Sequence, residues 1–271
     1  MSYTVEAGYQ VTNLELARLG LDNALARADT LESRRVSDNS LNENAAFPVV
    51  NVIRKNTYET WRPTSFSPKI VAQWNTPVTV NYVAVARHNI ASAGITGGSL
   101  WVTPTGGTLE KVADFVPTTD QPFLVPFVPT EIEAAEVRFG TGASAIVAVV
   151  HLGQAVVMER PLRASMQPVW LSRNTVVETQ TTEGGELLGP ILIRKGASIA
   201  PSWSNLSKSF YNGTLRSLAE QLPACPFFLA WQPDEHPAEV VYGTISGDPS
   251  GDHIPRSDRY NFSFSMTGAA L

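Results

Sequence analysis

The chain carries four histidines, the side chain that proteins use most often for acid–base catalysis and metal binding near neutral pH. They are His88, His151, His236 and His253. None lies in a recognisable catalytic or metal-binding spacing, and His151, inside an apolar run, is expected to be a hydrogen-bonded histidine in or at the edge of a sheet. The sequence also has no nucleophile elbow, phosphate-binding glycine loop, zinc-protease pair or calcium loop. These residues predict no catalytic site, no metal site and no cofactor.

Acid pairs are the second arrangement that could do chemistry, because glycoside hydrolases use two carboxyl groups. Asp234 and Glu235 are adjacent, and Glu131 and Glu133 are separated by one residue. A single sequence leaves such an enzyme open, since the two acids meet in space and not along the chain. Solvated turns are the favoured interpretation of both pairs, because Asp and Glu side chains are mostly exposed. We expect that the chain is not an enzyme.

Two short segments combine aromatic, amide and basic side chains in a way that suits sugar binding. Trp61 and Arg62 lie in one segment, and His88 and Asn89 lie in the other, just after a strand-like run. An indole offers an apolar plate to a pyranose ring, while Arg, His and Asn form directional hydrogen bonds. These residues are the candidate carbohydrate-binding site. The alternative is structural: Trp61 fills the core, and His88 with Asn89 bonds loop backbone groups.

The elements that would position these residues are short β-strands. Nineteen glycines and nineteen prolines are spread along the chain and interrupt short apolar runs, which is typical of sandwiches and barrels. Residues 78–86 alternate as a core strand, with one apolar face and a second face that starts polar and turns apolar. Further short strands are predicted at residues 99–102, 136–139 and 145–152.

The C-terminal part predicts two hairpins and a final strand. Residues 175–182 and 186–194 flank Gly184-Gly185, and paired glycines suit a tight turn. A second hairpin joins residues 227–232 to 239–245 through a loop with proline at both ends. The final strand is predicted from large apolar residues that alternate with polar ones: Tyr260, Phe262, Phe264 and Met266.

Helical patterns are scarce. Leucines near helical spacing predict one helix from Ser204 or Asn205 to Leu222, which Pro223 ends. Residues 13–28 fit either a helix or an extended segment, and the sequence leaves the choice open.

The composition favours a folded protein that does not bind nucleic acid. Of 271 residues, 43% are hydrophobic and 17% are charged, and the net charge is -5 without a cluster of Lys and Arg. The one cysteine, Cys225, excludes an internal disulfide and fits folding in a reducing compartment. The first residues lack the basic and apolar pattern of a secretory signal.

One uncharged stretch, from Phe139 to Met158, is about long enough to span a bilayer. Glycines and polar residues interrupt it, and its apolar part is short and β-branched. The stretch therefore predicts two buried strands and no membrane insertion.

Four segments of the first half resemble discoidin-like domains, which are also called galactose-binding-like domains. They are residues 46–51 (AFPVVN), 60–63 (TWRP), 70–74 (IVAQW) and 80–89 (VNYVAVARHN). In that family a paired asparagine and tryptophan precede a strand that leads into a buried sheet. The resemblance covers roughly residues 10–158 and implies an antiparallel jelly-roll sandwich. The chain lacks the cysteine pair that joins the ends of better-known members.

Segments of the second half are similar to those of phage tail and tail-tip proteins. They are residues 158–161 (MERP), 183–189 (EGGELLG), 226–233 (PFFLAWQP) and 238–242 (AEVVY). Together the two resemblances imply an all-β protein. An antiparallel jelly-roll sandwich, residues 1–160, is followed by a smaller β-rich assembly domain with one helix, residues 161–271.

The function implied is that of a virion structural protein of a phage tail or tail tip, folded in the host cytoplasm before assembly. Its partners would be copies of itself in a ring-like homo-oligomer and other tail proteins, and its discoidin-like domain would be a decoration or an adaptor for host attachment. The alternative is a carbohydrate-binding module for host surface glycans, with these contacts: Trp61, Arg62, His88 and Asn89.

Overall fold

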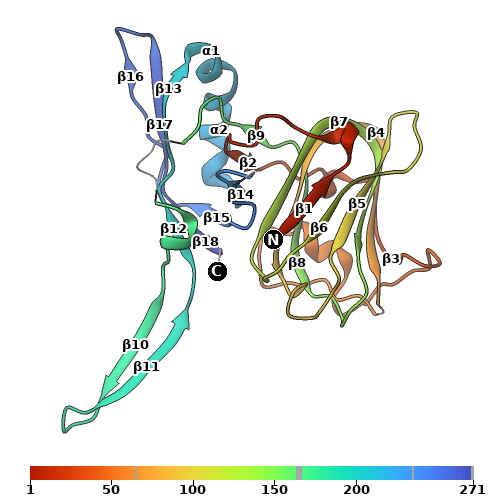
Figure 1. Ribbon diagram of the computed structural model, residues 1–271, viewed down its shortest axis with the longest axis horizontal. Coiled ribbons are helices and arrows are strands. Elements are labelled where there is room, and N and C mark those ends of the chain that lie inside the picture. Colours follow the sequence, from red (N-terminus) through yellow and green to blue (C-terminus); the bar gives the residue numbers. More distant parts are fainter. Residues whose placement is uncertain (65, 163–166, 234, 270–271) are drawn as a thin grey trace.

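The structure is a computed structural model that describes residues 1–64, 66–162, 167–233 and 235–269. It consists of two β-rich parts that lie side by side (Figure 1). Within these residues, nearly all regular structure is antiparallel sheet, with one α-helical segment in the second part. The predicted fold class, an all-β antiparallel sandwich followed by a smaller β-rich part with one helix, is confirmed.

The first part is a sandwich made from one seven-stranded sheet in the order β1-β6-β5-β7-β4-β3, with β8 paired to β4. The long strands β4 and β7 pair along two stretches with a register shift between them. The first stretch of β4 also pairs with β3 and the second pairs with β8. Strand β4 therefore runs through both layers of the sandwich. The bounds are β1 (Ser2–Val5), β3 (Thr30–Arg35), β4 (Pro68–His88), β5 (Gly98–Pro104), β6 (Glu110–Val116), β7 (Phe123–Phe139) and β8 (Val147–Gly153).

The main core lies between the two layers and is built from alternate residues of the strands. Polar atoms inside it are paired: Trp74 donates its Nε1–H to the Ala24 carbonyl at 3.0 Å. Short 3-10 turns at Ala24–Arg27 and Val49–Ile53 close the sides of this core, and another lies at Ala7–Tyr9. The largest fully buried members are Trp61, Phe115, Phe123, Phe127 and Phe139.

Strand β4 is buried on both faces over its second half. Val83 and Val85 belong to the sandwich core, whereas Tyr82, Ala84 and Ala86 face outward and are covered by the second part. The strand predicted at residues 78–86 is confirmed, but its unbroken alternation is not: Val80 packs in the sandwich core and Tyr82 faces outward, because the register shifts between them. Residues 82–86 are apolar on both faces because the sandwich core covers one face and the second part covers the other.

The second part holds a six-stranded sheet in the order β12-β18-β15-β14-β2-β9 and a three-stranded sheet in the order β13-β17-β16. The strands of the larger sheet are β2 (Arg18–Gly20), β9 (Val156–Val157), β12 (Ala197–Ile199), β14 (Phe227–Ala230), β15 (Val240–Ile245) and β18 (Met266–Ala269). Those of the smaller sheet are β13 (Ser202–Ser207), β16 (His253–Ile254) and β17 (Arg259–Ser263). Both predicted hairpins are confirmed: β14 pairs with β15, and β10 (Val176–Thr181) pairs with β11 (Leu187–Arg194).

The larger sheet crosses residue 160, where the sequence predicts a domain boundary. Leu19 of β2 pairs with Leu229 of β14, and β9 pairs with the other edge of β2. Two strands that precede Arg160 therefore complete the sheet of the second part, and the division into residues 1–160 and 161–271 stays a prediction. The undecided segment 13–28 forms β2 and a 3-10 turn.

The two parts meet across an apolar cluster between the outer face of the sandwich and strands β14 and β15. His151 lies in this contact, edge-on to the rings of Phe228 and Tyr242. Tyr82 donates its hydroxyl to the Asp22 carbonyl at 2.5 Å, and the same hydroxyl is 3.3 Å from His151 Nδ1. Burial lowers the pKa of His151 to about 4. The expectation of a hydrogen-bonded histidine in or at the edge of a sheet is confirmed.

The helix begins later than predicted, at Lys208, because residues 202–207 belong to β13. Ser207 caps it by accepting a hydrogen bond from the Phe210 N–H at 3.2 Å. The segment runs through α1 (Lys208–Phe210), a π-helical turn (Tyr211–Leu215), α2 (Arg216–Gln221) and a 3-10 turn (Leu222–Ala224). Gly213, which weakens the helical pattern, lies in the π-helical turn.

The predicted final strand is two strands, so the prediction of one continuous strand is wrong. β17 pairs with β13, whereas β18 pairs with β12 and β15, and the chain moves from one sheet to the other at Phe264 and Ser265. The apolar face is nevertheless shared, because Phe262, Phe264 and Met266 all pack in one core.

The stretch from Phe139 to Met158 forms strands, as predicted. It contains the end of β7, all of β8, which is buried throughout, and β9, which is half-buried. Among the described residues, no helix is long and apolar enough to cross a membrane.

Candidate functional site

A cleft of about 760 Å³ opens at one end of the sandwich, a volume typical of small-molecule sites. Its walls come from the segment before β4, from the end of β4, and from the loops before β7 and β8. The lining residues are Thr57, Tyr58, Thr60, Arg62, Arg87, His88, Asn89, Thr119, Asp120, Gln121 and Ile146. The structure therefore brings together three of the four residues predicted for a sugar site: Arg62, His88 and Asn89.

His88 ends β4 and borders the cleft, but both of its ring nitrogens bond backbone groups. Nε2 lies 2.8 Å from the Gln121 carbonyl oxygen, and Nδ1 accepts from the Ile90 N–H at 3.3 Å. This pattern assigns the proton to Nε2. Burial lowers the pKa of His88, so its neutral form is favoured. His88 holds the loop before β7 in place, which matches the structural alternative for this residue.

Asn89 fastens the loop before β8 to the end of β4. Its Nδ2 donates to the Ser144 carbonyl at 3.1 Å, and its Oδ1 accepts from the Ile146 N–H at 2.7 Å. Its backbone N–H bonds the Ile146 carbonyl at 3.1 Å. The amide is used inside the protein, so Asn89 shapes the wall of the cleft.

Trp61 lies in the sandwich core and not in the cleft. Its side chain is fully buried, its Nε1–H donates to Ser33 Oγ at 3.1 Å, and its ring centre is 5.7 Å from that of Phe139. Its backbone forms a bridge to Val147 of β8. An indole buried between the two layers of the sandwich cannot present a face to a sugar, so the prediction of Trp61 as a sugar contact is wrong.

The exposed aromatic side chain at the cleft is Tyr58, which the sequence analysis missed. It is 92% exposed. Asn56 Oδ1 accepts hydrogen bonds from the N–H groups of Tyr58 and Glu59 at 3.1 and 2.9 Å, which makes a side-chain turn. Arg54 pairs with Glu59 and supports the same turn. The available signal was Asn56, because an asparagine side chain that bonds the backbone two residues on makes a turn, and turns lie at the surface.

Two arginines supply positive charge to the cleft. Arg62 donates from Nε to Thr60 Oγ1 at 3.1 Å, and its guanidinium lies 4.2 Å from the ring centre of Phe47. These contacts fix the plane of the Arg62 guanidinium. Arg87 is exposed and has a φ of 53°, which turns the chain as β4 ends. Arg87 was also missed, although its neighbour His88 was selected.

Asp120 is the one carboxylic acid among the described residues that line the cleft. Its Oδ1 accepts from the N–H groups of Ala91 and Ser92 at 2.9 and 3.1 Å. Aromatic, guanidinium and carboxylate groups are suited to a pyranose face and to hydroxyl groups, whereas the usual hydrolysis of a glycosidic bond needs a second carboxyl group.

The other candidates for chemistry lie elsewhere. Glu131 and Glu133 are exposed on β7, and Glu235 is exposed in a loop, while its neighbour Asp234 lies outside the described residues. Within the described part of the chain, no group of three or more His, Cys, Asp or Glu side chains is placed to hold a metal ion.

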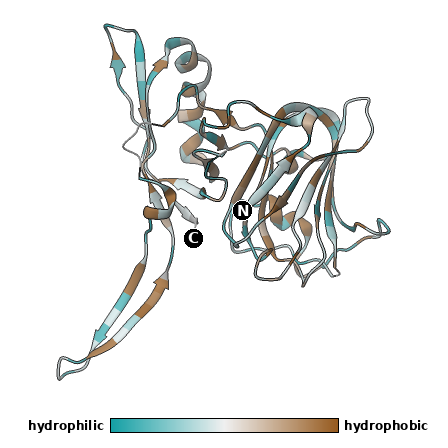
Figure 2. Ribbon diagram, in the orientation of Figure 1, coloured by the Kyte–Doolittle hydropathy of each residue, from teal (hydrophilic) through white to brown (hydrophobic). Residues whose placement is uncertain are grey.

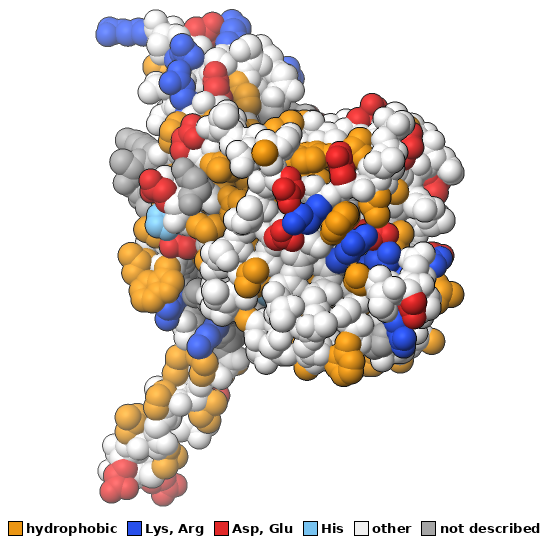
Figure 3. Space-filling view, turned by 45° about the vertical axis from the view of Figure 1, so that its right-hand side comes forward, with side chains coloured by type: hydrophobic (Ala, Val, Ile, Leu, Met, Phe, Trp, Pro, Cys, Tyr) orange, Lys and Arg blue, Asp and Glu red, His pale blue; other side chains and the backbone are white. Residues whose placement is uncertain are grey.

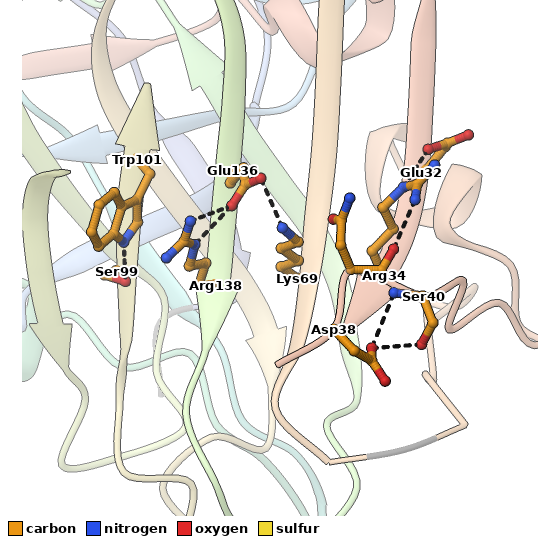
Figure 4. A network of polar contacts seen from close by, with 10 residues as sticks. Glu32, Arg34, Asp38, Ser40, Lys69, Ser99, Trp101, Glu136 and Arg138 are labelled. Atoms are coloured by element: carbon orange, nitrogen blue, oxygen red, sulfur yellow. Dashed lines mark hydrogen bonds and ion pairs between the residues drawn. The ribbon is translucent and has the colours of Figure 1, made fainter. Parts of the chain in front are cut away.

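A second polar cluster lies on the outer face of β4, β5 and β7 (Figure 4). Lys69 Nζ is 2.8 Å from Glu136 Oε1, and their side chains are only 7% and 12% exposed. Arg138 bonds the other oxygen of Glu136 at 2.7 Å and stacks 4.0 Å from the ring centre of Trp101. Both cations share the Glu136 carboxylate, so the cluster ties β4 to β7 on this sheet face.

Neither a family model nor a curated protein matches the sequence. Solved structures resemble about half of the chain. A family 32 CBM of Clostridium perfringens NanJ in complex with galactose has 15% identity and a TM-score of 0.39, over 50% of this chain and 98% of that one. The CBM32 of AlyQ in complex with 4,5-unsaturated mannuronic acid has 16% identity and a TM-score of 0.37, over 46% and 94%.

A third similar structure is a GH29 fucosidase of Ruminococcus gnavus in complex with fucose. It has 13% identity and a TM-score of 0.38, and the match covers 50% of this chain and 27% of the fucosidase. These structures give no support to the predicted place in a phage tail, which stays a prediction.

Proposed function

We propose that this chain is a glycan-binding module without catalytic activity, and that the cleft at the end of the sandwich is its site. One observation carries the proposal: the exposed ring of Tyr58 lines the same cleft as the guanidinium groups of Arg62 and Arg87. A pyranose offers an apolar face to the ring and hydroxyl groups to the charges. The bonds of His88 and Asn89 fix the loops beforehand, so binding orders few groups.

The charges of the cleft favour a sugar acid over a neutral sugar. Two arginines face one aspartate, and Oδ1 of Asp120 is already held by two backbone N–H groups. A carboxylate forms paired hydrogen bonds with a guanidinium, a geometry that a neutral hydroxyl cannot match. We expect galacturonate to bind more tightly than galactose, and the difference to shrink in high salt.

Isothermal titration calorimetry with these two sugars tests the site. Tyr58→Ala should weaken binding of both by about tenfold, because the stacked ring is lost. Phe66→Ala is the matched control, since Phe66 is 67% exposed and does not line the cleft. Arg87→Gln should remove the preference for the acid. Unchanged binding by a folded Tyr58→Ala protein would refute the site.

A structural role in a virion is the second candidate. The observation that favours it is the projecting hairpin β10–β11, whose exposed apolar side chains are typical of proteins that assemble (Figure 2). The role comprises a place in a phage tail or tail tip, a ring-like homo-oligomer, contacts with other tail proteins and folding in the host cytoplasm. Mass spectrometry of purified virions tests it, and absence of the chain from them would defeat it.

A further inference from the structure

The hairpin β10–β11 forms a two-stranded sheet of its own that projects from the second part (Figure 1). Every side chain of β10 is exposed. A two-stranded ribbon is marginally stable at best in water and needs a third strand or a packed face. Among the described residues, this hairpin has no third strand, and no packed face covers the side chains of β10.

Large exposed apolar side chains concentrate on this hairpin and at its base. The base contributes Trp170, 56% exposed, and Leu171, 57% exposed. Large exposed apolar side chains gathered on one element often mark an interaction surface. The members on the strands are Val176, Val177, Leu187, Leu188, Ile191, Leu192 and Ile193.

Among the side chains that the structure describes, one face of the paired strands carries no charge. Residues that pair directly in an antiparallel ladder point to the same face. The pairs on this face are Val177 with Leu192, Thr179 with Pro190, and Thr181 with Leu187. We call these six residues the uncharged hairpin face. The opposite face includes Glu178, Gln180 and Ile191.

The two ends of the hairpin carry opposite charges. Glu183 and Glu186 are exposed at the turn, whereas Arg173 and Lys195 are exposed at the base. Figure 3 shows the acidic tip of the projecting arm. Two hairpins that pack antiparallel bring each acidic tip to the basic base of the other, so both ends attract. A parallel pair would place like charges together.

We propose that the uncharged hairpin face is a self-association surface, which packs antiparallel against the same face of a second copy of this chain. The arrangement has a two-fold axis, so each residue of the face is used in both copies. It covers the ribbon on one side and pairs the charges at both ends. The inference goes beyond the proposed tail role, because a two-fold contact closes a dimer and not a ring, and it is independent of glycan binding.

Sedimentation equilibrium of the full chain over a range of concentrations tests the surface. The wild-type chain should show a monomer–dimer equilibrium. Leu192→Glu should raise the dimer Kd by about 100-fold or more, because it places a carboxylate inside an apolar interface. Gln180→Glu adds the same charge on the opposite face and should change the Kd by less than about threefold. Circular dichroism checks that each variant folds.

A charge exchange tests the antiparallel arrangement. Glu186→Lys should weaken the dimer by about tenfold, because the new lysine meets the partner's basic hairpin base. Adding Lys195→Glu to the same chain should restore most of the affinity. No rescue in the double variant would overturn the arrangement, and a wild-type chain that stays monomeric would overturn the surface.

The sedimentation experiment on the hairpin face and the virion test of the tail role can succeed or fail separately. If the wild-type chain forms a dimer that Leu192→Glu breaks, this inference is supported. If the chain is also absent from virions, the tail role alone is refuted. A virion protein whose association ignores Leu192→Glu defeats this inference alone.

Discussion

Acidification should weaken the contact between the two parts through His151. The ring lies between the outer face of the sandwich and strands β14 and β15, where removal from water lowers its pKa from 6.5 to about 4. Asp22 opposes this shift and Lys55 adds to it, but burial is the largest cause. In the unfolded chain the ring titrates near 6.5. The folded state therefore binds this proton less readily than the unfolded state does.

The sign and size of the effect follow from this difference. The contribution of His151 to stability is fully present above about pH 6.5 and is lost as the pH falls towards 4. At 1.36 kcal/mol per pKa unit, the interval from 6.5 to about 4 corresponds to about 3 kcal/mol in the free energy of unfolding. That is a large share of the roughly 5–15 kcal/mol by which most domains are stable.

Urea unfolding followed by tryptophan fluorescence at pH 7, 5.5 and 4.5 measures this loss. His151→Gln removes the titrating ring, so between pH 7 and pH 4.5 the wild type should lose about 2 to 3 kcal/mol more than the variant. His88, whose pKa burial also lowers, contributes equally to both proteins and cancels. Phe228→Leu disturbs packing in the same contact without a titrating group, so its loss should parallel that of the wild type. Equal pH profiles for the wild type and His151→Gln would refute the reasoning.

Three further changes test the packing of the fold by chemical denaturation. Trp61→Ala empties part of the sandwich core and should cost about 3–5 kcal/mol; a variant as stable as the wild type would contradict the buried indole. Lys69→Met leaves the nearly buried Glu136 without its ammonium partner and should cost about 1–3 kcal/mol, and a cycle with Glu136→Gln should reveal coupling between the two. Ser207→Ala removes the helix cap and should cost about 1 kcal/mol, whereas Ser207→Asp should retain most of the stability.

The sheet content could be predicted because a strand is a local pattern. The run of residues 78–86 was sufficient to identify the core strand, but it does not reveal the register shift that exchanges the faces between Val80 and Tyr82. Pairing between distant segments has no local signal. Nothing near Leu19 indicates that it pairs with Leu229, and nothing near Phe264 indicates that the chain there changes sheets.

The candidate site could be located from the sequence but not assigned residue by residue. Aromatic, amide and basic side chains gather in the segments that form the cleft, so the region was found. Which of them face solvent depends on turns and packing. Trp61 and Tyr58 are three residues apart, yet the first is fully buried and the second is 92% exposed. His88 and Asn89 were selected for groups that are already bonded to backbone.

The place of β2 in the larger sheet affects how the chain is made. The ribosome releases Leu19 early, but its neighbour on β14 follows only after all the sandwich strands. Since folding can begin during synthesis, the sandwich is complete while Tyr82 and Ala84 still face water. Each nascent chain thus passes through a stage in which this apolar outer face of the sandwich is exposed and prone to aggregate. A fragment ending near residue 160 would keep the face exposed.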